Sequence, residues 1–497
     1  MTRTSRLRRL LPAVLITGLI GLLASAGAAA AGPLTLPLYV STQGSLLSQF
    51  GYAPDFTQHI PAFDSTNRPY IRSRNASQDD TGYVNVLKGG VWQRFTMLAA
   101  LQAAYPQLAG TFGAGGYASD RIVFDSLDRA YTILSIRLEE GELRNVMLYS
   151  LDRCVTWQVC ELPFGDAQPI YDEHNFGNVA CEYFTGHNLT GRPPFLALWR
   201  EQSDWSGDWA TRNELWVVQP YFDGDTLRIP KPTLVTDRFL GMIQCSGGGS
   251  FAATAGQRTF FVWTEVTSKP SNGAPTYVGV YDHALGGVVE RRLVCSAKPG
   301  NDVHDTPAIC LDSRGLLHVV SGAHNRPMVY TRSLAPLDIG AWSAPVNVLT
   351  SGHVSRQTDA DGAGKQTYTS LVCGPDDTLH LACRQMRRGA GQPYWPGWYS
   401  ALVHVRKTAG GAWSRPQQLV IPSNGGGYMN YYHKLTIDRR GRLYLSFSLS
   451  RTEDPTWLRP LSRFRQRMVL SSGDGQSWQL ADTASFTSGL PAAPQSP

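Results

Sequence analysis

The sequence is poor in charge, in cysteine and in long apolar runs. Charged residues make up 17% of the chain, with 45 Lys and Arg against 39 Asp and Glu, so the formal net charge is only +6. Four of the basic residues are arginines close to the N-terminus, and the rest of the chain is nearly neutral. Nucleic-acid binding depends on neutralising phosphates with basic residues, and this composition gives it no electrostatic support.

An apolar run from Leu10 to Leu23 follows those arginines and precedes a stretch of small residues that ends at Gly32. A basic segment, a short apolar segment and a small-residue cleavage zone, in that order, are typical of a secretory signal peptide. We therefore expect residues 1–32 to be a signal peptide, the mature chain to begin near Gly32, and the protein to be secreted or periplasmic. No later run is long enough to span a bilayer, so we expect no membrane insertion.

Cysteine is sparse, with eight residues in the whole chain. An oxidising compartment allows some disulfides, but so few cysteines do not form the framework of the fold, and their spacing does not fix a pairing. The eight are Cys154, Cys160, Cys181, Cys245, Cys295, Cys310, Cys373 and Cys383.

What the sequence contains instead is a repeat. Its clearest copy, from Pro307 to Val320, has an apolar strand, a turn with Asp312 and Gly315, and a second apolar strand, which predicts a β-hairpin. Related hairpins have turn residues at 64, 125, 312, 374 and 438, at intervals of 61, 187, 62 and 64 residues. Weaker copies near 186 and 254 fill the long interval, so the chain carries seven repeats.

Each hairpin is followed by a third apolar segment and commonly by a Trp that opens a fourth. Four short strands in each of seven repeats predict an all-β fold, a seven-bladed β-propeller with four-stranded antiparallel blades over residues 33–490. We expect a surface helix over Phe95–Ala104 and a disordered tail over 491–497. Two segments, Ser150–Trp157 and Ser471–Trp478, look like the Asp-box of sialidase-type repeats, a structural turn that supports the fold alone.

The repeat also predicts which residues converge. The residue before the first strand and the residue after the second meet opposite the hairpin turn, and in a propeller these ends surround one mouth of the channel. Polar residues occupy these positions in most repeats. Before the first strand they are His59, His174, Asn175, His304, Tyr368 and His433, and after the second strand they are Arg74, Asn75, Arg200, Glu265, His324 and Arg384.

The densest polar set lies in the last three repeats, where five of these residues share one end of neighbouring blades. A single His or Tyr before a strand is usually an ordinary loop residue, whereas five together favour a functional site. By contrast, His318 and His380 lie in mid-strand, where a packed histidine is the simpler interpretation. His380 and Cys383 are weak candidates for a zinc site, because two ligands at this spacing specify little.

The last three repeats resemble the BNR-type repeat proteins that include the seven-bladed ulvan lyases, polysaccharide lyases that act on a sulfated algal polyuronide. The matching residues are His304–Pro307, Leu311–Gly315, His318, Gly322–Tyr330, Tyr368, Arg384 and His433. The first half of the chain resembles this family only through the repeat. The chain departs from it at Asp305, where Asn often follows the histidine in related repeats.

The resemblance implies an active centre made of Tyr368 and Arg384, with His304 and His433 from the flanking repeats. Substrate binding is then assigned to the other polar residues at the mouth, which are His324, His174, Asn175, Arg74 and Asn75. The expected activity is β-elimination within a uronic-acid-containing, ulvan-like polysaccharide. We expect a monomer whose partner is this acidic polysaccharide, and catalysis that needs no cofactor, with a structural Zn²⁺ or Ca²⁺ left open.

The chemistry of elimination favours the same residues. Removing the proton α to a uronate carboxylate requires a cation that neutralises the carboxylate as carbanion character grows, and Arg384 suits this role. A base and an acid must also act on the C5 proton and the leaving oxygen, and Tyr368 and His304 are candidates for both. His433 would orient them or share the task.

Two other functions remain open. A sialidase-type glycoside hydrolase would need an arginine cluster with a Tyr/Glu pair, or two opposed carboxylates, and the mouth positions contain few carboxylates. A non-catalytic glycan-binding propeller would use exposed tryptophans such as Trp205, Trp395 and Trp398 as sugar platforms.

Overall fold

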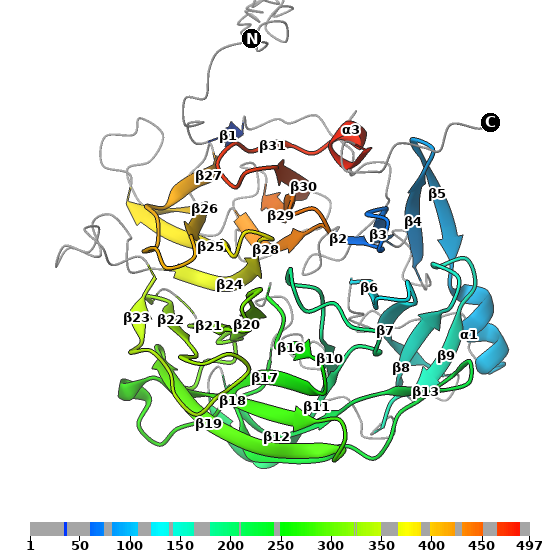
Figure 1. The fold of residues 1–497 in the computed structure, drawn as a ribbon, viewed down its shortest axis with the longest axis horizontal. Coiled ribbons are helices and arrows are strands. Elements are labelled where there is room, and N and C mark those ends of the chain that lie inside the picture. Colours follow the sequence, from blue (N-terminus) through cyan, green and yellow to red (C-terminus); the bar gives the residue numbers. More distant parts are fainter. Residues whose placement is uncertain are drawn as a thin grey trace, which may run out of the picture.

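Seven four-stranded antiparallel sheets follow one another around a central axis, which confirms the seven-bladed β-propeller (Figure 1). The computed structural model describes residues 34–36, 60–73, 82–107, 121–138, 143–163, 179–207, 210–242, 249–322, 324, 326–348, 366–388, 398–422, 430–450 and 465–487. The expected signal peptide and C-terminal tail lie outside these residues.

Within each blade the strands are hydrogen-bonded in sequence order. The strands of blades 1 to 4 are β2 (Pro61–Phe63), β3 (Pro69–Ser73), β4 (Tyr83–Lys88) and β5 (Val91–Thr96); β6 (Val123–Phe124), β7 (Ala130–Arg137), β8 (Leu143–Ser150) and β9 (Gln158–Glu161); β10 (Val179–Cys181), β11 (Leu196–Gly207), β12 (Ala210–Val218) and β15 (Thr233–Phe239); and β16 (Ala252–Ala255), β17 (Arg258–Thr264), β18 (Ala274–Asp282) and β19 (Gly287–Ala297). Those of blades 5 to 7 are β20 (Ala308–Leu311), β21 (Leu317–Ser321), β22 (Val329–Arg332) and β23 (Val346–Asn347); β24 (Gln366–Cys373), β25 (Leu379–Arg388), β26 (Trp398–Lys407) and β27 (Gln417–Pro422); and β28 (Asn430–Ile437), β29 (Leu443–Ser450), β30 (Arg465–Ser472) and β31 (Gln479–Leu480).

A few elements decorate the blades. Strand β1 (Leu34–Leu36) adds to the outer edge of blade 6, parallel to β27, and β13 (Tyr221–Asp223) pairs with β14 (Thr226–Arg228) in blade 3. The helices are α1 (Leu98–Ala104), α3 (Thr483–Thr487) and the 3₁₀ turn η2 (Pro270–Asn272). The expected helix therefore begins three residues later than predicted, because Phe95 and Thr96 still pair with β4. No helix among the described residues is both long and apolar enough to cross a bilayer.

The Asp in the turn of an inner hairpin organises that turn. In blade 2, Asp125 Oδ1 accepts the backbone N–H groups of Leu127 at 2.9 Å and Arg129 at 3.0 Å, and the same pattern recurs at Asp64, Asp312 and Asp438. The residue three positions further on has a positive φ, which a Gly, Asn or Asp adopts at least cost. These residues are Asn67, Asp128, Gly315, Asp377 and Gly441.

This left-handed residue also links neighbouring blades. Asp128 accepts the backbone N–H and hydroxyl of Ser65 in blade 1, at 2.6 and 2.7 Å. Asp377 of blade 6 does the same for Ser313 of blade 5, with both distances 2.8 Å. Where this residue is Asp, it both adopts the left-handed backbone of its own turn and binds the turn of the preceding blade.

The core lies between adjacent blades. Alternate residues of an inner strand face the blade on either side, so that in β20 Ala308 and Cys310 pack toward blade 6 while Ile309 and Leu311 pack toward blade 4. The seven cysteines among the described residues are free thiols, and most of them are buried in this core.

Blades 1 and 7 each take their four strands from one continuous segment, so side chains close the ring between them. Asn67 of blade 1 accepts the backbone N–H of Arg439 at 2.8 Å and donates to Asp438 at 3.1 Å. On the apolar side, Phe486 of α3 stacks on Tyr444 of blade 7, with ring centroids 5.0 Å apart.

Candidate active site at one mouth of the channel

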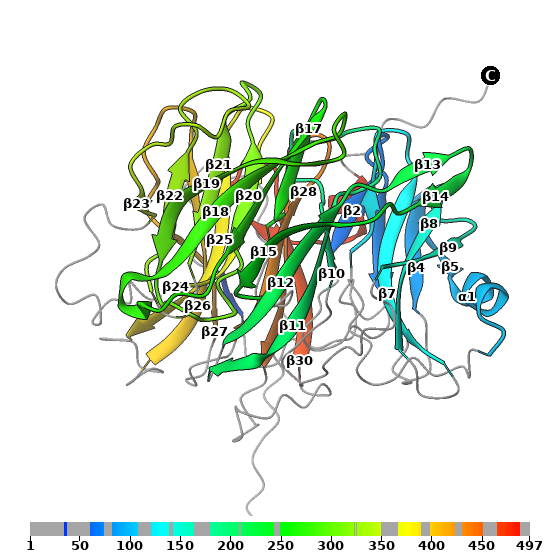
Figure 2. The same ribbon diagram turned by 90° about the horizontal axis from the view of Figure 1, so that it is seen from below.

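The inner strands run between the two ends of the propeller, as the side view in Figure 2 shows. One end carries the hairpin turns, and we call the opposite end the mouth. His304 precedes β20 and His324 follows β21, as the repeat predicts. Tyr368, Arg384 and His433 are also at the mouth, but they lie inside β24, β25 and β28, because these strands extend further than the sequence pattern indicates.

Two matching β-bulges shape the mouth. In β24 the register shifts between Thr367 and Ser370, and Tyr368 has a φ of 65°. In β28 it shifts between Tyr431 and Lys434, and Tyr432 has a φ of 43°. A left-handed conformation is uncommon for tyrosine, and bulges that re-aim side chains are frequent beside active sites.

Tyr432 was not among the predicted site residues. Its ring lies 5.4 Å from that of Tyr368, centroid to centroid. A sequence signal for it existed, because it directly precedes His433 at the position in blade 7 that Tyr368 occupies in blade 6.

Asp302 holds the two histidines of blade 5. Its Oδ1 lies 2.8 Å from Nδ1 of His304, and its Oδ2 lies 2.9 Å from Nδ1 of His324. The imidazole rings are consequently close, with centroids 3.9 Å apart. Asp302 was not among the residues predicted from the sequence, although a carboxylate two residues before a histidine at the mouth was the available signal. Each imidazole is thereby oriented through Nδ1.

These contacts, together with burial, shift the pKa values of Asp302 and His304. Burial alone would raise the pKa of Asp302, but hydrogen bonds from His304 and His324 outweigh it and hold that pKa well below its usual range. Burial lowers the pKa of His304, and the charges of His324 and Arg384 also lower it, although the hydrogen bond to Asp302 opposes them. The result is an ionised carboxylate beside a histidine that is neutral at neutral pH.

Tyr368 lies at the centre of the cluster. Its ring centroid is 6.0 Å from that of His304 and 5.7 Å from that of His324. The guanidinium of Arg384 lies 4.6 Å from the same ring centroid, as a cation–π pair. Arg384 is only 1% exposed, so its charge is screened little by solvent.

The environment of His433 suits a residue that orients its neighbours. It is 1% exposed, and its Nε2 lies 3.2 Å from the carbonyl oxygen of Ala382 and so donates to it. Burial, with the nearby charges of Lys434 and Arg384, lowers its pKa to about 3. It therefore stays neutral near neutral pH and supports the two bulges.

The structure brings together His304, His324, Tyr368, Arg384 and His433. Of the other predicted residues, Arg200 lies in β11 and forms an ion pair with Glu214 at 2.7 Å, and Glu265 follows β17 and accepts a hydrogen bond from Trp263 at 3.2 Å. The predicted substrate-binding residues Arg74, Asn75, His174 and Asn175, together with His59, lie outside the described residues.

Strand geometry separates His380 and Cys383, the two weak candidates for a zinc site. Residues three apart on a strand point to opposite faces, so Cys383 packs in the core between blades 5 and 6 while His380 Nδ1 lies 3.1 Å from Nε2 of His404. At the mouth, by contrast, Asp302, His304 and His324 present ligand atoms within 4.8 Å of one another and could hold a metal ion.

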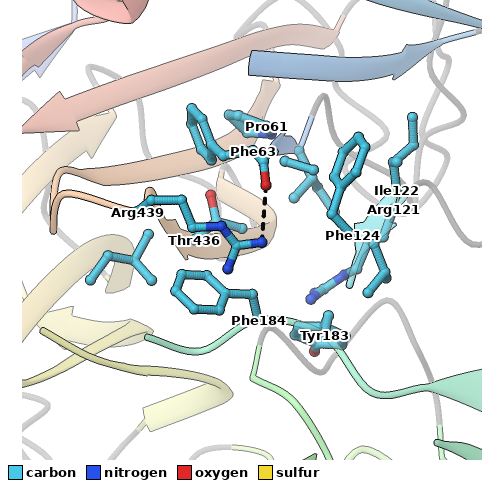
Figure 3. A pocket seen from close by; sticks show the side chains of 13 residues that line it. Pro61, Phe63, Arg121, Ile122, Phe124, Tyr183, Phe184, Thr436 and Arg439 are labelled. Carbon is cyan, nitrogen blue, oxygen red and sulfur yellow. Dashed lines mark hydrogen bonds between the residues drawn. The ribbon is translucent and has the colours of Figure 1, made fainter. Parts of the chain in front are cut away.

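A separate pocket lies among blades 1, 2, 3 and 7 (Figure 3). Arg439 and Arg121 reach into it and stack on Phe184 and Tyr183 respectively. None of the clustered residues at the mouth lines this pocket, so it is separate from the candidate site.

Comparison with known proteins supports the repeat. Residues 275–462 match the model of the BNR repeat-containing family, which confirms the resemblance over much of the second half of the chain. The chain is thus a seven-bladed β-propeller that carries BNR-type repeats. A search of curated proteins found no match.

Several solved structures are similar in fold. An ulvan lyase from a new polysaccharide lyase family, bound to -[GlcA(1-4)Rha3S]-, is 10% identical, with 88% of this chain and 96% of that chain covered and a TM-score of 0.44. A protein of unknown function from Dyadobacter fermentans is 12% identical, covering 72% and 94%, with a TM-score of 0.39. A mutant Trypanosoma rangeli sialidase with trans-sialidase activity is 12% identical, covering 85% and 58%, with a TM-score of 0.37.

Proposed function

We propose that this chain is a polysaccharide lyase that cleaves a uronate-containing, ulvan-like polysaccharide by β-elimination. The arrangement around Tyr368 carries the proposal: two histidines held by one carboxylate and a buried arginine all lie close to its ring. These are the groups that elimination needs, which are a neutral base, a proton donor and a cation.

Arg384 would supply the cation. The proton on C5 of a uronate is poorly acidic, and it becomes removable when positive charge stabilises the carboxylate as negative charge develops on it. The guanidinium is shielded from solvent, so its charge acts on a bound carboxylate with little screening.

His304 would be the base. The hydrogen bond between its Nδ1 and Asp302 fixes the tautomer in which Nε2 is the basic nitrogen of the ring. Its lowered pKa keeps it unprotonated at neutral pH. It would take the C5 proton, and the C5–H electron pair would form the C4=C5 double bond.

Tyr368 would be the acid. Its hydroxyl would give a proton to the O4 leaving oxygen as the C4–O4 bond breaks, which balances the proton taken by His304. Transfer of that proton back to the tyrosinate, across the short gap between the two rings, would restore the site. The site suits glycoside hydrolysis less well, because hydrolysis uses carboxyl groups as acid and base, and the carboxylate of Asp302 is already hydrogen-bonded to both histidines.

The test is the ultraviolet absorbance of unsaturated uronate ends during incubation of the purified protein with a panel of polyuronides that includes ulvan. We expect the parent to give a signal and Tyr368→Phe and Arg384→Ala to lose about 10²–10⁴-fold in rate, the usual contribution of a positioned catalytic group. Tyr330→Phe is the matched control, because Tyr330 is a buried tyrosine of blade 5 that bonds to His318, away from the mouth.

Release of reducing ends without absorbance would mean a hydrolase. If neither absorbance nor reducing ends appear while the protein still binds the saccharide, the protein would be a glycan-binding propeller. Either result would overturn the proposal.

A further inference from the structure

A second cluster of metal-ligating side chains lies at the hairpin-turn end, opposite the mouth. His187 is on the loop between β10 and β11 of blade 3, Cys373 ends β24, and Asp377 is in the turn that follows. Nε2 of His187 is 3.5 Å from Oδ1 of Asp377. The ligand atoms of all three residues lie within 4.8 Å of one another.

The blade 3 loop is pressed against blade 6 to make this contact. The backbone N–H of Cys373 donates to the carbonyl of Thr185 at 2.8 Å, and His187 Nε2 donates to the carbonyl of Gly374 at 2.9 Å. Gly186 has a φ of +121°, and a Cβ there would lie 1.8 Å from the carbonyl oxygen of Cys373. Only glycine allows so close an approach, so the position of His187 is built into the loop.

A second thiol adjoins the first. Cys310 of blade 5 and Cys373 of blade 6 face each other in one buried cluster between these blades, and both are fully buried. Cys310 is not one of the residues whose ligand atoms converge with those of His187 and Asp377. The cluster therefore offers one sulfur, one imidazole nitrogen and one carboxylate.

We propose that Cys373, His187 and Asp377 bind one structural Zn²⁺. Thiolate and imidazole ligands select zinc in a tetrahedral site, where Zn–S distances of about 2.3 Å and Zn–N distances of about 2.0 Å set the ligands roughly 3.3–3.8 Å apart. The observed spread requires small side-chain rotations. On binding, zinc displaces the Cys373 thiol proton and the Nε2 proton that now reaches Gly374.

Ser313 supports the carboxylate ligand. Its backbone N–H and hydroxyl donate to the two oxygens of Asp377, both at 2.8 Å, and so orient it. The ion would join blades 3 and 6 at the end of the channel away from the reacting groups. Its role is thus to stabilise the fold, and it is independent of the proposed lyase activity.

The test is zinc content by mass spectrometry of the reduced full chain, together with absorption spectra after cobalt substitution. We expect one zinc per chain, and thiolate-to-cobalt bands with the visible bands of a tetrahedral ion. His187→Ala changes a half-buried loop residue and Cys373→Ser changes one atom. Each should weaken zinc binding by at least about 100-fold, because even outer partners of metal ligands cost 10–100-fold.

Cys383→Ser is the matched control, since Cys383 is a buried thiol of the same core cluster and lies outside the site. His324→Ala tests the other ligand group, at the mouth, and should leave the cobalt–thiolate bands unchanged. Absence of zinc from the parent, retention of full affinity in His187→Ala, or a Cys310–Cys373 disulfide in the natively purified protein would overturn the proposal.

Discussion

Asp302 is the residue on which the candidate chemistry most depends, because it acts through the two histidines that it holds. Its two oxygens bind the Nδ1 atoms of His304 and His324 and so decide which nitrogen of each ring can act on a substrate. Its own low pKa means that it stays charged across the working range. It is a positioning residue of the kind that sets both tautomer and ionisation.

Asp302→Asn should therefore change the pH profile as well as the rate. Its carboxylate raises the pKa of His304 against the effect of burial, so removing the charge lowers that pKa further and moves the acid limb of kcat to lower pH. The rate should also fall about 10²-fold, because the tautomer is no longer fixed.

The measurement is kcat against pH in the elimination assay for both proteins. Asp237→Asn, an exposed partner of Arg212, should match the parent. An acid limb that stays in place or moves upward in Asp302→Asn would contradict the assignment of His304 as the base.

The inner hairpins were predictable because a turn that contains an Asp and a left-handed residue has a recognisable sequence pattern. The positions of Asp125 and Asp312, six residues before the matching second-strand residue, located the blades directly. The bulges at Tyr368 and Tyr432 were not predictable, since a one-residue shift of register depends on the partner strand and not on local pattern. For the same reason the sequence placed Tyr368 before its strand.

The short helix α3 closes the ring between blades 7 and 1. Phe486 is 1% exposed and lies between Tyr444 and Trp92, with the Trp92 ring centroid at 5.7 Å. Phe486→Ala should lower the free energy of unfolding by about 3 kcal/mol, the lower part of the range for a buried Phe because the site is near the chain end.

Chemical denaturation measures this change. Leu480→Ala, which alters a residue 44% exposed on the preceding strand, should change stability by less than about 0.5 kcal/mol. Equal effects of the two variants would show that α3 does not close the ring.

At the scale of the whole molecule, the propeller gathers residues that are far apart in the sequence at its two ends. The mouth collects Asp302, Tyr368 and His433 from three blades, while the opposite end collects His187, Cys373 and Asp377. The first group was largely predictable, because the repeat assigns equivalent positions to the same end. The second was not, because the loop that carries His187 departs from the repeat and crosses toward blade 6.

The central claim is elimination at the mouth, and isotope labelling tests it most directly. The purified protein is incubated with a uronate polysaccharide in water enriched in oxygen-18, and the products are weighed by mass spectrometry. Elimination adds no water, so the account predicts unsaturated ends without the heavy isotope and none of these products with Tyr368→Phe. Saturated products that have gained one labelled water for each bond cleaved would mean hydrolysis and would contradict it.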